Sequence, residues 1–338
     1  MKTFCLLTIL CLGAGLASAQ NPAAVQQADS WRWHDSIPVP ATSSNAAPEF
    51  YSGETSDVGP QTLLQLKPRR TYVQASLDEQ YFYTDNMFLT DHGKQGADVS
   101  ITTIQAALAP SPYEFQGGLL APRAGYQHQW FSYGLLDDDR VRTFNFTDST
   151  YATNRLNKFD FNVQTVFSDV SWGWENWDFT AGLDFRQFLD SGNYREFYRE
   201  AVPRWAMHRT FQITENKSIL LGYEGDYRFT QTENPLPLEH RFYNDRTDHS
   251  LVLLGNWAVC PHFIVQPFYR LQYSYYPRGR TGREDWLNSF GLALNFPFTK
   301  NIALRTFVSC ETLHTDGAYV QSYDKLDAGG GLNLTVRF

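Results

Sequence analysis

Apolar and polar residues alternate with a period of two along most of the chain from Arg70 onward. In 177–185 the odd positions are apolar, as at Trp177, Phe179 and Phe185, whereas Asp178 and Asp184 stand at even positions. In a β-strand such sets point to opposite faces, whereas a helix would scatter them around its circumference. The pattern therefore predicts strands with one apolar and one polar face.

The alternation predicts about twelve strands, each near the length that a tilted strand needs to cross a bilayer. We expect them at 70–82, 98–108, 117–134, 157–173, 177–188, 200–214, 218–231, 247–259, 262–276, 285–297, 301–313 and 325–338. In the fourth segment we expect Phe159, Phe161, Val163 and Phe167 on the apolar face, opposite Asp160, Asn162, Gln164 and Ser168.

The links between these segments alternate between short and long. Tight turns are expected near 175–176, 215–217, 260–261 and 299–300, and a moderate link with two prolines at 109–116. Longer polar links are expected at 83–97, 135–156, 189–199, 232–246, 277–284 and 314–324. Outer-membrane barrels show this alternation because their periplasmic turns are short and their extracellular loops long. A soluble β-sandwich has little reason to show it, so we predict an all-β, antiparallel up-and-down transmembrane barrel over 70–338.

The first 69 residues have a different character. Lys2, an apolar core and the small residues before Ala19 are typical of a signal peptide over 1–19. The apolar run is shorter than the roughly 20 residues of a spanning helix, and Leu10 before Cys11 does not suit a lipoprotein start. Residues 20–69 are rich in Ala, Pro, Ser and Gln and predict a flexible periplasmic segment. Trp31 and Trp33 leave open a role for this segment as a plug.

Composition narrows the class further. The mean hydropathy is −0.41, so no transmembrane helix is expected, but the aromatic fraction of 16% suits the aromatic girdles of a barrel. A net charge of −8 gives no basic surface for nucleic acid. Cys260 and Cys310 fall in strands that are not neighbours, so no disulfide is expected.

The C-terminal strand carries an ordered pattern of its own. Leu332, Leu334, Val336 and the terminal Phe338 share one face, opposite Asn333, Thr335 and Arg337. This pattern resembles the C-terminal insertion signal of bacterial outer-membrane barrels. The segment 81–89 follows the first predicted strand with tyrosines, an Asp-Asn pair and apolar residues, and it is similar to a pattern often found in β-barrel porins of Gram-negative bacteria. The resemblance implies recognition by the barrel-assembly machinery and insertion among outer-membrane lipids. It names no substrate.

The polar faces hold the candidate functional residues. A charge facing lipid at the midplane costs ~2–4 kcal/mol, so charged residues of the alternating segments are expected in the lumen. The expected lumen charges are Asp160, Asp178, Asp184, Arg186, Glu224, Asp226, Arg228, Arg270, Arg305, Glu311 and Arg337. Arg123 and Arg209 do not fit this assignment of charged residues to the lumen face unless a β-bulge shifts the alternation in their strands.

Rings of lumen charge set ion preference, so the first functional hypothesis is a porin-like channel for small solutes. Arg186, Arg228 and Arg270 would favour anions if they are unpaired. The alternative is a structural or adhesion barrel with a closed lumen and partner-binding loops. A rim hydrolase is a weaker third. Asp248-His249 and the 137–139 loop do not reproduce the spacing of the omptin protease family, and His208-Arg209-Thr210 offers threonine where the outer-membrane phospholipase family needs serine. No cofactor or metal is expected, and the oligomeric state stays open.

Overall fold

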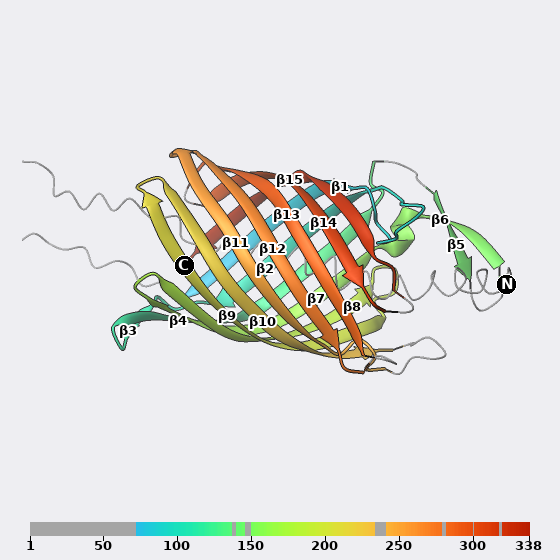
Figure 1. Ribbon diagram of the computed structural model, residues 1–338, viewed down its shortest axis with the longest axis horizontal. Coiled ribbons are helices and arrows are strands. Elements are labelled where there is room, and N and C mark those ends of the chain that lie inside the picture. The colour runs from blue at the N-terminus through green and yellow to red at the C-terminus, as the bar shows by residue number, and fades with distance from the viewer. Residues whose placement is uncertain are drawn as a thin grey trace, which may run out of the picture.

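The computed structural model describes residues 72–136, 140–145, 150–233, 241–278, 282–299, 301–317 and 320–338. Twelve long strands form one closed antiparallel ring (Figure 1). They are β1 (Val73–Thr84), β2 (Ala97–Leu108), β4 (Gly118–Tyr133), β7 (Phe161–Trp174), β8 (Trp177–Asp190), β9 (Glu196–Thr214), β10 (Lys217–Thr232), β11 (Arg246–Cys260), β12 (Phe263–Tyr276), β13 (Arg283–Pro297), β14 (Ile302–Thr315) and β15 (Tyr323–Arg337).

The ring closes because the first strand pairs with the last. Strands adjacent in the meander pair with each other, and β1 pairs with β15 along eleven residue pairs from Gln74–Arg337 to Thr84–Asp327. We call this contact the seam. Beyond β15, the Phe338 N–H donates to the carbonyl of Val73 and the Tyr72 N–H donates to the carbonyl of Phe338. Closure leaves none of the twelve strands as an open edge, which hydrocarbon would not tolerate.

The twelve predicted strands and the alternation of short and long links are confirmed. The short links, including those between β7 and β8 and between β9 and β10, lie at one end of the barrel, which we call the turn end. The long links gather at the opposite loop end, on the right of Figure 1. The sequence did not predict the short elements in the links: β3 (Tyr113–Phe115), β5 (Arg140–Asn145), β6 (Thr150–Arg155) and the 3-10 helix η1 (Leu156–Phe159).

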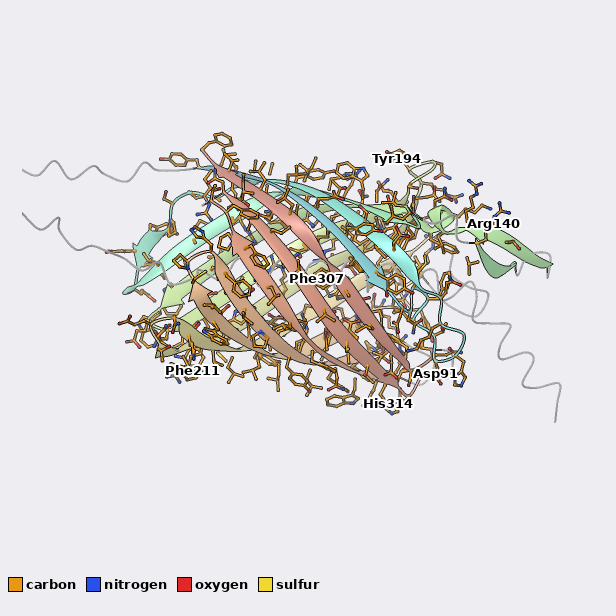
Figure 2. All side chains as sticks on the ribbon, turned by 90° about the horizontal axis from the view of Figure 1, so that it is seen from above. Asp91, Arg140, Tyr194, Phe211, Phe307 and His314 are labelled. Carbon is orange, nitrogen blue, oxygen red and sulfur yellow. The ribbon has the colours of Figure 1, made fainter. Side chains whose placement is uncertain are left out.

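The outer surface of the barrel is apolar and aromatic. Leu221, Phe229, Leu251 and Phe290 are 50%, 54%, 52% and 53% exposed, although each sits within a strand. Side chains of this type belong against hydrocarbon, as on the lipid face of a membrane barrel. Figure 2 shows the side chains around the ribbon, with Phe211 near the turn end.

Arg209 belongs to this outer surface and needs no β-bulge. Its guanidinium lies 5.0 Å from the Trp177 ring centre and 4.9 Å from that of Phe211. These residues lie close to the turn end, where aromatic girdles sit at the edge of the membrane. A cation stacked on aromatic rings can reach the polar interface from such a position.

The predicted phase of β7 is wrong. Phe161, Val163 and Phe167 are 1%, 0% and 7% exposed and face the interior, whereas Val166 and Val170 are 58% and 41% exposed. Phe161 stacks on Phe131 of β4 with ring centres 4.4 Å apart and planes 10° apart. The interior thus contains an apolar cluster as well as charges. Because β7 carries apolar residues on both faces, its sequence pattern does not indicate which face lies inside.

Several predictions lie outside the described residues: the signal peptide at 1–19, the segment 20–69 and the acidic loop 137–139. Cys260 and Cys310 are free thiols on β11 and β14. Over the described ranges, no helix is long and apolar enough to span a bilayer.

Candidate functional site

The interior of the barrel brings together most of the predicted lumen charges. Asp184, Arg186, Arg228, Arg305 and Glu311 are all below 10% exposed. The half-buried inward residues are Glu224, Asp226 and Arg270. Asp178 and Arg337 share the inward phase of their strands but are exposed, because both stand at the turn end.

Asp160 does not belong to this group. It follows η1 at the loop end, and its carboxylate accepts a 2.8 Å hydrogen bond from the Tyr133 N–H. Partial burial raises the pKa of Asp160 to about 6, although this hydrogen bond opposes the rise. It was predicted as a lumen charge because the even-numbered positions of this segment were assigned to the lumen. The structure places the odd-numbered positions, such as Phe161, on the inside.

A continuous series of ion pairs follows the inner wall across six strands, and we call it the ion-pair belt. Successive nitrogen and oxygen atoms lie 2.8–3.4 Å apart. From β4 to β11 its members are Arg123, Asp169, Arg204, Asp184, Arg186, Glu200, Arg228, Asp248 and Arg246.

Cations and anions alternate along the belt, and their charges cancel. The nine members are five arginines and four carboxylates. Asp226, which lies 3.1 Å from Arg228 and which we count with the belt from here on, supplies a fifth carboxylate. Charges with so little exposed surface are held only when each has a partner and further hydrogen bonds. The belt therefore places dense but neutralised charge on the wall of the lumen.

Glu200 is the central anion of the belt. It is 1% exposed, and its Oε1 lies 3.3 Å from Arg186 and 3.4 Å from Arg228. The Tyr198 hydroxyl donates to its other oxygen at 3.3 Å. One carboxylate thus joins β8, β9 and β10 by countering two arginines.

Gly182 allows the belt to pass over β8. Arg204 on β9 reaches Asp169 on β7, two strands away, at 3.1 Å. A Cβ on Gly182 would lie 3.0 Å from the Asp169 Cβ and 3.1 Å from the Arg204 Cζ. The glycine leaves the room through which the arginine crosses its neighbour strand.

Smaller polar clusters accompany the belt in the interior. Glu224 lies 3.2 Å from His208 and 3.3 Å from Arg270. On β15, Lys325 contacts Glu311 at 2.8 Å and Asp327 at 3.2 Å. Arg283 pairs with Asp285 and stacks on Tyr276, with 3.9 Å to the ring centre.

Sequence reasoning placed Asp184, Arg186, Asp226 and Arg228 in the lumen but missed the other six residues of the belt. Asp169 was not considered, because its side of β7 was assigned to lipid, and Arg123 was judged to fit the lumen only with a β-bulge. Glu200, Arg204 and Asp248 share the parity of lumen residues on their own strands, and that parity was the signal that could have found them.

The described residues among those considered for hydrolysis do not converge. Asp248 faces the interior, whereas His249 is on the outer face, where its Nδ1 lies 2.7 Å from the Tyr223 hydroxyl. His208 is inward and adjacent to Glu224, and Arg209 is outward. No cluster of three or more histidine, cysteine or acidic residues suited to a metal occurs in the described part of the chain.

Solved structures that align with the chain include outer-membrane channels, porins and autotransporter domains. An outer-membrane channel from Pseudomonas putida F1 aligns over 80% of this chain and 97% of its own, with 10% identity and a TM-score of 0.48. The β domain of the Bordetella autotransporter BrkA covers 79% of this chain and all of its own length, with 12% identity and a TM-score of 0.43.

The NanC porin aligns over 76% of this chain and 98% of its own, with 12% identity and a TM-score of 0.41. No protein-family model and no curated protein matches the chain. These likenesses concern barrel architecture alone. The geometry itself identifies a closed β-barrel of twelve strands, apolar on the outside and charged within.

Proposed function

We propose that the protein is an outer-membrane, porin-like channel for small solutes. The observation that carries this proposal is the ion-pair belt inside a barrel with an apolar exterior. Charges on the inner wall favour a hydrated lumen, and rings of charge govern what passes through it. A ring of twelve strands encloses more space than one of eight and less than the sixteen of a large porin, which suits small solutes.

The proposed location in the outer membrane rests on the apolar outer and charged inner surfaces of the barrel wall and on the C-terminal strand. Leu332, Leu334 and Phe338 are 49%, 37% and 63% exposed on the outer face, and Val336 is half-buried beside them. We propose that this strand is the insertion signal read by the barrel-assembly machinery, after export on the signal peptide predicted at 1–19. Lipid would then cover the exposed apolar band.

The structure bears on the charge preference of such a pore. Anion preference was expected on the condition that Arg186, Arg228 and Arg270 are unpaired, and each has a carboxylate within 3.4 Å. The belt offers equal numbers of opposite charges. We therefore propose a pore with weak preference between anions and cations.

The test is the current through planar lipid bilayers containing the purified, folded barrel. We expect discrete conductance steps in potassium chloride and, across a salt gradient, a reversal potential close to zero. Heat-modifiable electrophoretic mobility would show that the barrel is folded. A folded barrel with no current above that of the empty bilayer would contradict the proposal and favour a closed barrel with partner-binding loops.

A further inference from the structure

A second part of the inner wall is polar without being charged. Gln80 on β1, Thr103 on β2, Gln129 on β4 and Thr165 on β7 are 0%, 2%, 0% and 4% exposed. Their strands are consecutive in the ring, and Thr103 is the direct cross-strand partner of Gln129. We call these four residues the neutral wall.

The neutral wall has hydrogen-bonding capacity that the described protein does not use. Neither amide atom of Gln129 has a partner among the described residues, and the same holds for the Gln80 Oε1 and for the hydroxyls of Thr103 and Thr165. Buried polar groups of native proteins nearly always have partners, and an unpartnered one requires an explanation. Four such side chains on adjacent strands suggest that the partner comes from the contents of the lumen.

The surroundings restrict the chemistry of that partner. Next along β2 and β4 towards the loop end, Ile101 and Phe131 are each 1% exposed and supply no hydrogen bond. The side of the ring opposite the neutral wall includes β10 and β11, which lie six strands away from β1 and β2 respectively. There Arg228 of β10 and Asp248 of β11 are already paired with each other.

Two charged residues border the wall, and both already have partners. Asp78, the cross-strand partner of Thr103, accepts hydrogen bonds from Gln80 at 2.7 Å and from Asn333 at 3.3 Å. Arg186, the cross-strand partner of Thr165, pairs with Asp184 and Glu200. Among the described residues, a charged solute would thus have to compete with these partners for a countercharge, and stripping its water would be costly.

An uncharged solute with several hydroxyl groups meets these conditions. Amide oxygens accept, amide nitrogens donate, and threonine hydroxyls do both, so the wall can match groups that also do both. A polar site that hydrogen-bonds a hydroxyl discriminates strongly against solutes lacking it. We infer that the neutral wall is a binding subsite for neutral sugars or similar uncharged polyhydroxylated solutes in transit. This inference rests on the proposed channel function.

The experiment measures how three related solutes block the ion current: glucose, the anionic glucuronate and the cationic glucosamine. We expect glucose to block at the lowest concentration. The double variant Gln129→Leu with Thr103→Val should raise the half-blocking glucose concentration about fivefold, as the loss of one hydrogen bond would. Its conductance in potassium chloride should stay within about twofold of the wild type, because no belt charge is altered.

Thr312→Val is the matched control, since Thr312 is exposed on the outer face of β14. It should leave glucose block unchanged. Removal of unpartnered buried polar groups does not threaten folding, and heat-modifiable mobility would verify this for the double variant. Equal block by the three solutes, or an unchanged half-blocking concentration in the double variant, overturns the inference while the channel stands. A folded barrel without any current overturns both.

Discussion

Glu200→Gln should destabilise the barrel by ~3–5 kcal/mol, because breaking a buried ion pair leaves uncompensated charge. Here the change leaves Arg186 and Arg228 to face each other without the anion that lies within 3.4 Å of both. The neutral amide can keep a hydrogen bond to Tyr198 but not the charge. Urea unfolding in detergent, followed by tryptophan fluorescence, measures the loss.

The same substitution should alter ion preference. The belt of the variant carries one more positive charge than negative. The reversal potential in a salt gradient should therefore shift in the direction that indicates a preference for anions. Glu215→Gln is the matched control, since Glu215 is exposed in the turn between β9 and β10. If both variants unfold at the wild-type urea concentration and keep its reversal potential, the belt neither supports the barrel nor faces the conduction path.

Gly329→Val should prevent closure of the seam. Gly329 is the cross-strand partner of Phe82, and a Cβ there would overlap the backbone carbonyl of Tyr81 and the Cα and Cβ of Phe82. Backbone atoms of a paired strand cannot move aside without breaking the pairing, so the cost should reach or exceed the ~1–3 kcal/mol of ordinary overpacking. Folding into lipid vesicles should yield little of the compact, heat-modifiable form.

Ala328→Val provides the comparison at the neighbouring position. Ala328 is exposed on the outer face of β15, so the added methyl groups would extend into lipid and leave the seam intact. This variant should fold with the wild-type yield. Equal folding of the two valine variants would mean that β1 and β15 do not meet as closely as the register requires.

The strands were predictable because one side of the wall meets hydrocarbon and the other does not. On β10 this leaves Leu221 and Phe229 outside and Glu224 and Arg228 inside, a contrast that alternation alone reveals. On β7 the contrast disappears, since Phe161 faces an interior aromatic row and Val166 faces outward. The phase of β7 is fixed by its pairing with β4 and β8, which lies outside any local pattern.

The partners within the site were less predictable than its members. Arg204 pairs with Asp169 across a strand because Gly182 leaves room, and no spacing along the chain encodes that contact. The carboxylates Asp184 and Asp226 beside Arg186 and Arg228 were on the predicted list, but Glu200, which contacts both arginines, comes from the strand between theirs. The neutral wall was missed for a related reason, since glutamine and threonine in a strand carry no signal until burial shows that they lack partners.

The central claim is that the inner wall of this barrel faces a conducting aqueous path, and adjacent residues of β12 test it most directly. Arg270 faces inward beside Glu224, whereas Tyr269 is 40% exposed on the outer face. Each would be replaced by cysteine in a background where Cys260 and Cys310 are serine, and a charged, water-soluble methanethiosulfonate would be added during bilayer recording. The account predicts that the reagent reduces the current through the Arg270→Cys channel and leaves the Tyr269→Cys channel unchanged. A current unaffected in both variants, or reduced only in Tyr269→Cys, would contradict it.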